Sequence, residues 1–337
     1  MSLDRAAATT ATKPHEQLAL HLAAGMAKVN ALIAQRMESE HAPRIPQVTA
    51  HLVGAGGKRL RPMLTLAAAE LCGYDGPYHV HLAATVEFIH TATLLHDDVV
   101  DESTQRRGRP TANLLWDNQS SVLVGDYLFA RAFQLMVEPG NLRVLEILSN
   151  AAATIAEGEV LQLSAARDLK TDESVYLKVV RGKTAALFSA ATEAGGVLAG
   201  ATPAQIQALF DYGDALGIAF QIVDDLLDYS GDSQQTGKNI GDDFRERKLT
   251  LPVIKAVAMA DTAERAFWAR AIEKGDQQPG DLDHAIALMQ QHGTLDATRR
   301  DALDWADRAK AAMQALPDHP LRHMLTDLAD YVVARLR

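Results

Sequence analysis

Apolar residues recur at intervals of three and four positions along almost the whole chain, which is the spacing that places them on one face of an α-helix. Breaks rich in Gly and Pro separate these stretches, and no alternating pattern typical of a β-hairpin accompanies them. The predicted helices cover about 15–39, 58–73, 78–102, 119–137, 140–166, 172–199 and 203–230, followed by several shorter ones. The pattern therefore predicts an all-α fold.

Length and composition agree with one large helical domain. The 337 residues are 47% hydrophobic, which is ample for a sizeable buried core. No break is long enough for an interdomain linker, so residues 15–337 are predicted to form a single domain preceded by a loose tail, residues 1–14. Residues after about 255 are expected to pack as a helical flank. No tract approaches the ~20 apolar residues of a membrane span.

The net charge and the single cysteine restrict the partners of the protein. A formal charge of −10 argues against a nucleic-acid surface, which needs clustered Lys and Arg on a basic background. An anionic ligand would therefore need local basic residues or a metal ion. The lone Cys72 excludes an internal disulfide and a cysteine-based zinc site, and it fits the reducing cytoplasm.

One acidic pattern, D-D-x-x-D, occurs twice within predicted helices. Its copies are Asp97-Asp98-Val99-Val100-Asp101 and Asp224-Asp225-Leu226-Leu227-Asp228. On a helix the first and last carboxylates stand one turn apart on the same face, with Cβ atoms about 5–6 Å apart. Like charges at this spacing destabilise a helix by about 0.2–0.5 kcal/mol per pair in water, and by more where burial lowers the dielectric constant. A cation that bridges the two carboxylates would remove this repulsion.

A solvated acidic face is the simplest interpretation of one such cluster, but two features indicate an enclosed site here. Both clusters are flanked by apolar residues, which a fully solvated helix would lack. Each also continues a polar stripe along its helix, His90-Thr93-Asp97-Asp101 in the first and Gln221-Asp224-Asp225-Asp228 in the second. Two facing stripes would enclose a polar cavity, whose hard oxygen ligands favour Mg²⁺ or Mn²⁺ bound together with a phosphate or diphosphate.

Basic residues beside the acidic clusters could contact the remaining phosphate oxygens. They are Lys58, Arg59 and Arg61 in GGKRLRP, Arg106 and Arg107 in RRGRP, Lys183 with Thr184 in RGKTAAL, and Lys238 in GKNIGDDFRERK. The first stretch precedes a predicted helix, whose free backbone N–H groups also favour anions. An isolated Lys or Arg is usually a surface residue, so it is the position beside the acidic clusters that favours a binding role.

Three other motifs fail or fit less well. Residues 182–184 (GKT) match the end of a Walker A loop, but Leu177 stands where that motif needs Gly. Residues 54–56 (GAG) begin a dinucleotide-binding loop, but Arg59 takes the place of its last Gly. Two Glu-x-x-His matches, Glu38–His41 and Glu87–His90, leave a di-iron carboxylate bundle as a weaker alternative.

A series of motifs between residues 54 and 253 resembles the signature blocks of the all-trans polyprenyl diphosphate synthases. The motifs are, in order, GGKRLRP, FIHTATLLHDDVVDESTQRRGRPTAN, VLVGDYLFARAF, AEGEVLQL, GKTAALF, FQIVDDLLDY and GKNIGDDFRERKLTLP. The resemblance is greatest to the members that make octaprenyl and decaprenyl diphosphate for quinone side chains. It implies an isoprenoid synthase helical bundle around a central cavity, usually a homodimer. The implied reaction is Mg²⁺-dependent head-to-tail condensation of isopentenyl diphosphate with farnesyl or geranylgeranyl diphosphate.

The resemblance also implies a role for individual residues. The metal ligands would be Asp97, Asp101, Asp224 and Asp228, and the further catalytic residues would be Asp98, Asp225 and Lys183. Isopentenyl diphosphate would be held by Lys58, Arg61, His90 and Arg107. The allylic substrate would be held by Arg106, Lys183, Thr184, Gln221 and Lys238. Transient contact with a membrane is expected when the long apolar product is released.

Product length is expected to depend on the residues just before Asp97. The growing chain would leave the metal site past Thr93, Ala92, Ile89 and Val86. Ala92 and Thr93 are small where short-chain members of the family carry a bulky aromatic residue, so an open tunnel and a long product are expected. The alternative is that both are small only for close helix packing. Candidates for the tunnel floor are Phe133 and Met136.

Two rival functions would share the helical bundle. A terpene cyclase would have the first acidic motif, but Asp224-Asp225 and GGKRLRP are unlike its usual sequence. A non-catalytic partner subunit of a heteromeric synthase would tend to lose acidic motifs, and both are intact here.

Overall fold

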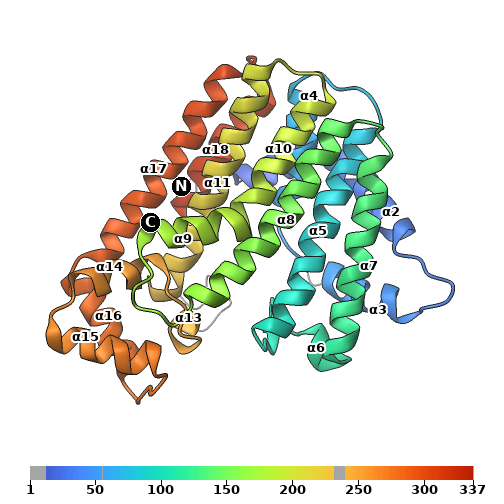
Figure 1. The fold of residues 1–337 in the computed structure, drawn as a ribbon. Coiled ribbons are helices and arrows are strands. Elements are labelled where there is room, and N and C mark those ends of the chain that lie inside the picture. Colours follow the sequence, from blue (N-terminus) through green and yellow to red (C-terminus); the bar gives the residue numbers. More distant parts are fainter. Residues whose placement is uncertain (1–12, 55, 231–239, 337) are drawn as a thin grey trace, which may run out of the picture.

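A computed structural model describes residues 13–54, 56–230 and 240–336, and nearly all regular structure in them is helical (Figure 1). The helices are α1 (Pro14–His21), α2 (Ala23–Arg36), α3 (Arg44–Gly54), α4 (Leu60–Leu71), α5 (Tyr78–Val100), α6 (Ala112–Leu115), α7 (Asn118–Val137), α8 (Leu142–Ala165), α9 (Glu173–Val180), α10 (Ala186–Leu198), α11 (Pro203–Ser230), α13 (Asp242–Arg245), α14 (Leu251–Met259), α15 (Thr262–Trp268), α16 (Asp281–Gln291), α17 (Thr294–Ala312) and α18 (Pro320–Ala334). Three short helical turns complete the helical structure of the described residues. Two are π-helical, Arg181–Ala185 and Ala269–Glu273, and one is a 3₁₀ turn, Met313–Ala315. The prediction of an all-α fold is confirmed.

Helix α10 lies at the centre of the bundle, where it packs against α4, α5, α8 and α11 (Figure 1). Its sequence ALFSAATEAGGVL explains this position, because it is apolar or small on almost every side and most of its residues are buried. Gly195 allows the close approach to α4: a Cβ at this position would lie 2.8 Å from the carbonyl oxygen of Thr65. Around this centre, α7 packs against α5, and α17 packs against α11.

Buried apolar side chains form two clusters. The larger one extends from α1 to α18 and includes the fully buried Phe88 and Tyr212. The smaller one surrounds the fully buried Trp268 and joins the end of α11 to α13, α14, α15 and α16. These four helices lie at one end of the bundle (Figure 1). The prediction that residues after about 255 form a helical flank therefore holds for α15 and α16 but is wrong for α17 and α18, which belong to the larger cluster and pack against α11. The assignment of residues 15–337 to a single domain stays a prediction.

The stretch predicted as one helix, 15–39, is in fact two helices. Helices α1 and α2 are bent by 74° relative to each other, and α2 ends at Arg36. The apolar periodicity continues through the bend, so the sequence pattern does not reveal it. Among the described residues no single helix is long and apolar enough to cross a membrane, and only this bent pair passes that test by length and composition.

Other local elements also depart from the predicted pattern. Helix α3 begins within the Pro-containing run after α2, since Pro46 falls in its first turn, where a missing N–H breaks no helical hydrogen bond. Two-residue strands, β1 (Gln105–Arg106) and β2 (Arg109–Pro110), pair antiparallel. Arg107 and Gly108 join them with φ of 53° and 74°, as a tight hairpin turn requires. The predicted helix 172–199 is divided by the first π-helical turn.

Candidate active site

The two acidic motifs lie at the C-terminal ends of α5 and α11, and the π-helical turn before α10 contacts both helices. Lys183 Nζ lies 3.8 Å from Asp97 Oδ2 of α5. The next residue, Thr184, donates a hydrogen bond of 2.9 Å to Gln221 Oε1 of α11. Because consecutive residues reach the two helices, both motifs border the same part of the interior. Figure 1 shows both helix ends on the lower side of the bundle, near α6 and α13.

Two glycine residues hold this π-helical turn against α8. A Cβ at Gly158 would lie 2.7 Å from the backbone nitrogen of Lys183, and a Cβ at Gly182 would lie 2.8 Å from Gly158 Cα. Side-chain carbons do not approach that closely, so the turn and α8 can contact each other only with glycine at both positions. Single π-helical turns are frequent at functional sites. Here the turn brings Lys183 and Thr184 to the acidic helices.

The carboxylates of the first acidic motif have different partners. Asp98 is fully buried, and its Oδ1 accepts a hydrogen bond from Arg106 Nε at 2.8 Å and lies 2.7 Å from Arg106 Nη2 in an ion pair. Its Oδ2 is buried and has no hydrogen-bond partner among the described residues. Burial raises the pKa of Asp98, and Arg106 opposes this rise. Asp101 lies 3.4 Å from Lys248 Nζ, a contact that the sequence pattern does not predict.

Lys183 lies between two carboxylates. Its Nζ is 2.9 Å from Glu159 Oε2 and 3.8 Å from Asp97 Oδ2. Burial raises the pKa of both Asp97 and Glu159, and the nearby ammonium group of Lys183 opposes the rise. Glu159 belongs to the motif AEGEVLQL, but the sequence assigns it no individual function. Its contact in the structure shows that it holds the ammonium group of Lys183.

The second acidic motif is positioned by hydrogen bonds from α9, from the start of α13 and from Gln221 of α11 itself. The buried Asp225 accepts one from Tyr176 of α9 at 2.6 Å and one from Gln221 Nε2 at 2.7 Å. Gln221 therefore turns its amide nitrogen to Asp225 and its oxygen to Thr184. Asp228 accepts from the backbone N–H groups that begin α13, at 3.2 and 3.0 Å. Burial and the neighbouring Asp225 raise the pKa of Tyr176 well above its usual value, so this phenol stays a donor.

A basic cluster lies where α4 begins beside α5. Arg61 Nη1 donates to His90 Nε2 at 3.4 Å, and its guanidinium carbon lies 4.5 Å from the centre of the Phe188 ring. Burial lowers the pKa of Arg61 to about 10, which leaves it charged at neutral pH. Burial and the surrounding arginines lower the pKa of His90 well below its usual value, so His90 is a neutral acceptor.

The remaining basic residues are divided between the two sides of the site. Arg106 turns to Asp98, whereas its neighbour Arg107 donates to the carbonyl oxygen of Gly56 in the loop before α4. Lys58 Nζ lies 3.2 Å from the Tyr331 hydroxyl of α18. The structure therefore separates two adjacent arginines for which the sequence predicts different substrates. Lys238 lies outside the described residues.

Comparison with known proteins establishes the family of the chain. The family model described as Polyprenyl synthetase matches residues 42–289. The chain belongs to the polyprenyl synthetase family. It is 48% identical over 312 residues to octaprenyl diphosphate synthase of Escherichia coli (strain K12), an alignment that covers 93% of this chain and 96% of that protein.

Solved structures of similar proteins agree with this polyprenyl synthetase fold. A decaprenyl diphosphate synthase from Rhodobacter capsulatus is 76% identical to this chain, with a TM-score of 0.94. The match covers 96% of this chain and 100% of that one. A polyprenyl synthase from Caulobacter crescentus, complexed with calcium and isoprenyl diphosphate, is 52% identical with a TM-score of 0.91, over 96% and 98% of the two chains. The predicted family, the isoprenoid synthase fold and the assignment as a trans-prenyltransferase are confirmed.

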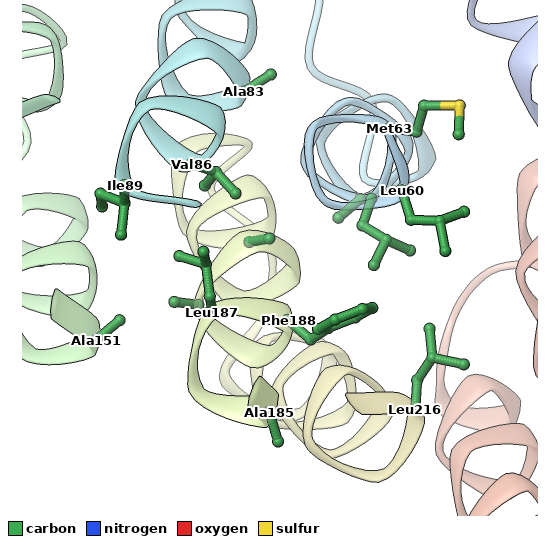
Figure 2. Close-up of a cluster of buried hydrophobic side chains, with 14 of the residues drawn as sticks. Leu60, Met63, Ala83, Val86, Ile89, Ala151, Ala185, Leu187, Phe188 and Leu216 are labelled. Atoms are coloured by element: carbon green, nitrogen blue, oxygen red, sulfur yellow. The ribbon is translucent and has the colours of Figure 1, made fainter. Parts of the chain in front are cut away.

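In this polyprenyl synthetase the residues before the first acidic motif line the interior of the bundle. Of the four residues predicted to lie along the product path, Ala92, Ile89 and Val86 are fully buried on α5. Thr93 is half-buried and donates to the carbonyl oxygen of His90 at 2.8 Å. Figure 2 shows Val86 and Ile89 among apolar side chains that include Leu187 of α10 and Ala151 of α8.

Of the two candidates for a tunnel floor, only one points into the bundle. Met136 is fully buried on α7, whereas Phe133 on the same helix is 44% exposed. The assignment of Phe133 to the floor is therefore wrong for the single chain, because its position on α7 turns it to the outer surface.

Proposed function

We propose that this polyprenyl synthetase condenses isopentenyl diphosphate head-to-tail with an allylic diphosphate in a Mg²⁺-dependent reaction. The primer is farnesyl or geranylgeranyl diphosphate, and the product is an octaprenyl to decaprenyl diphosphate for a quinone side chain. The observation that carries the proposal is the pair of acidic motifs connected through Lys183 and Thr184, beside a separate basic cluster. The names of the relatives, octaprenyl and decaprenyl diphosphate synthase, support the product range.

The two acidic motifs fit a hard divalent cation. We assign Asp97, Asp101, Asp224 and Asp228 as its ligands, because all of their donors are carboxylate oxygens, which favour Mg²⁺ or Mn²⁺. Within the described residues no group of three or more His, Cys, Asp or Glu is arranged to hold a metal by itself. Mg²⁺ commonly takes one or two carboxylates and completes its shell with water and substrate phosphates. The calcium in the Caulobacter crescentus relative supports a divalent ion.

On the allylic side, the C–O bond at C1 breaks, which leaves a carbocation and a diphosphate with growing negative charge. Bound Mg²⁺ would supply Lewis-acid stabilisation of those oxygens. Lys183 and Arg106 add fixed positive charges, and each is held in place by a carboxylate, Glu159 and Asp98 respectively. Thr184 turns its hydroxyl proton to Gln221, so its oxygen keeps lone pairs that can face the carbocation.

On the other side, the basic cluster would bind the diphosphate of isopentenyl diphosphate through Lys58, Arg61, His90 and Arg107. The isopentenyl double bond then forms the new C–C bond at the allylic C1, and the proton lost from the isopentenyl unit passes to the departing diphosphate. His90 accepts a hydrogen bond from Arg61, so we assign it to orienting that arginine and not to donating a proton. The lengthened product is again an allylic diphosphate, which allows further cycles.

Elongation in vitro tests the proposed function directly. Purified protein with Mg²⁺, farnesyl diphosphate and labelled isopentenyl diphosphate is expected to give labelled octaprenyl to decaprenyl diphosphate, sized chromatographically after removal of the diphosphate. EDTA should stop the reaction and excess Mg²⁺ should restore it. If no primer is elongated in the presence of metal, the proposal fails and a non-catalytic partner subunit is favoured. A cyclic hydrocarbon product would instead indicate a terpene cyclase.

We also propose a homodimer formed through α7 and α8. These adjacent helices expose half of the large apolar side chains found on the surface of the described residues, namely Val122, Leu123, Phe133, Val137, Leu142, Val160 and Leu163. Exposed apolar surface of this extent is typical of an interface. Light scattering should therefore give twice the chain mass of 36.4 kDa. Leu123→Glu should shift the protein to a monomer, while Leu20→Glu at the exposed face of α1 should not; a wild-type monomer would contradict the dimer.

A cytoplasmic location and transient membrane contact complete the proposal. The lone Cys72 is half-buried and in the thiol form, which suits a reducing compartment. A polyprenyl product of this length is strongly apolar, so its release calls for a membrane or another apolar acceptor. Both statements stay predictions.

A further inference from the structure

Glu87 is a buried carboxylate outside both acidic motifs. It lies on α5 one turn before His90, in the second Glu-x-x-His match, and is 8% exposed. Its Oε1 accepts a hydrogen bond from Arg59 Nη1, and the two side chains of this ion pair are 10% and 19% exposed. Because Glu87 pairs with an arginine and not with a second carboxylate, the match does not support the di-iron alternative.

Arg59 contacts this carboxylate, and two further guanidinium groups are near enough for their charges to act on it. The charges of Arg59, Arg61 and Arg107 all act on Glu87 and lower its pKa against the rise that burial causes. Glu87 is also the anion whose charge acts on both Arg61 and Arg107. Guanidinium groups that converge in a partly desolvated region repel one another strongly, since the low dielectric constant increases the repulsion. A single carboxylate among them reduces this repulsion.

Glu87 also fixes the beginning of α4. Arg59 stands just before the helix in the left-handed conformation, with φ 49° and ψ 35°, where a non-glycine residue is strained. The ion pair with Glu87 anchors its side chain and so holds this conformation. Arg61 follows two residues later in the first turn of α4. The direction of its side chain therefore depends on the backbone conformation of Arg59, where the helix begins. Its contacts with His90 and Phe188 then complete its position.

We propose that Glu87 is a positioning residue for isopentenyl diphosphate. Its negative charge neutralises Arg59 and keeps the guanidinium groups of Arg61 and Arg107 close to each other, so that both can bind the same diphosphate. This inference rests on the proposed function, because it assumes that the basic cluster binds isopentenyl diphosphate. Loss of the negative charge has two opposed effects: it makes the cluster more positive, and it lets the guanidinium groups move apart. The second effect dominates, because bidentate binding of phosphate depends on geometry as well as charge.

Glu87→Gln tests the proposal, because it keeps the shape of the side chain and removes its charge. At saturating farnesyl diphosphate, the KM for isopentenyl diphosphate is expected to rise about tenfold or more, as misplacement of binding groups typically causes. The KM for farnesyl diphosphate and kcat should change much less. Glu87→Asp keeps the charge and should recover part of the loss. If Glu87→Gln leaves the KM for isopentenyl diphosphate unchanged or lowers it, the positioning role is wrong.

Two further measurements separate positioning from general loss of structure. Arg59→Gln should raise the same KM, and the double variant Glu87→Gln/Arg59→Gln should be non-additive, since both act through one ion pair. Glu264→Gln removes a similarly buried carboxylate, which pairs with His292 at 2.8 Å in the flank, and should leave both KM values unchanged. Equal rises in the KM of both substrates would contradict the proposal. Failure of the proposed function itself would appear earlier, as wild-type protein that elongates no primer.

Discussion

Asp97→Asn is expected to lower kcat about 10³-fold while leaving the fold at least as stable as before, because several kcal/mol of transition-state stabilisation depend on the metal that this carboxylate would hold. The stability of the fold should not fall, since Asp97 is half-buried close to Asp98 and Asp101, and these like charges repel it. Lys183 would lose a contact of 3.8 Å but keep the one of 2.9 Å to Glu159. Both quantities are measured on one preparation, kcat by elongation and the midpoint of thermal unfolding by calorimetry.

The opposite signs of the two effects make Asp97→Asn informative. Asp283→Asn removes an exposed carboxylate on α16 and should change neither activity nor unfolding temperature. Wild-type protein should also be stabilised by Mg²⁺ together with a diphosphate, and Asp97→Asn should lose most of this increase. A variant that keeps more than a tenth of the wild-type kcat would exclude Asp97 as a metal ligand. A variant that unfolds at a much lower temperature would show that the carboxylate is structural.

The same repulsion explains why each carboxylate of the first acidic motif has a cationic partner from outside α5. Lys183 contacts Asp97, Arg106 contacts Asp98, and Lys248 contacts Asp101, each with a separate ammonium or guanidinium group. Burial raises the pKa of Asp97 and Asp98, and Lys183 and Arg106 oppose the rise, so these two carboxylates can stay ionised. Ionised carboxylates are the form that binds a divalent cation. The fold thus favours the anionic form of Asp97 and Asp98 while limiting the destabilisation.

Local patterns in the sequence predict most of the helices and both acidic motifs. The three-and-four spacing of apolar residues identifies α5 and α11, and D-D-x-x-D is recognisable because its spacing is that of a helical turn. The bend between α1 and α2 and the π-helical turn within 172–199 are not visible in this way, because the apolar periodicity continues through both. Helix α3 is hidden for a different reason: its proline falls in the first turn, where proline is tolerated.

The partners of the site residues could not be predicted, because the fold brings them together from distant positions. Tyr176 on α9 reaches Asp225 across 49 positions of sequence, and Lys248 reaches Asp101 across 147. Glu159 is no more conspicuous in the sequence than the exposed Glu157 two residues before it. What distinguishes these side chains is burial and a charged neighbour, and both arise only from tertiary packing.

Ala92→Phe is expected to shorten the product by several isoprene units without stopping condensation. Ala92 is fully buried on α5 five residues before Asp97, and Ile89 and Val86 continue from it into the apolar interior shown in Figure 2. A phenyl ring here would obstruct the path along which we propose that the growing chain leaves the metal site. Ala92→Val and Ala92→Leu should give intermediate lengths, because the obstruction grows with side-chain volume. Product size is measured by chromatography of the dephosphorylated polyprenols.

The alternative, that Ala92 is small only for helix packing, gives a different result. Overpacking of a well-filled core costs about 1–3 kcal/mol of stability, and on that view Ala92→Phe would lower the unfolding temperature and the yield but not the product length. Ala67→Phe is the matched control, because Ala67 is also fully buried but lies on α4. It should lower stability and leave product length unchanged. Full-length product from a folded Ala92→Phe variant would place the tunnel elsewhere, whereas shortening that follows volume at position 92 and not at 67 would make Ala92 part of its wall.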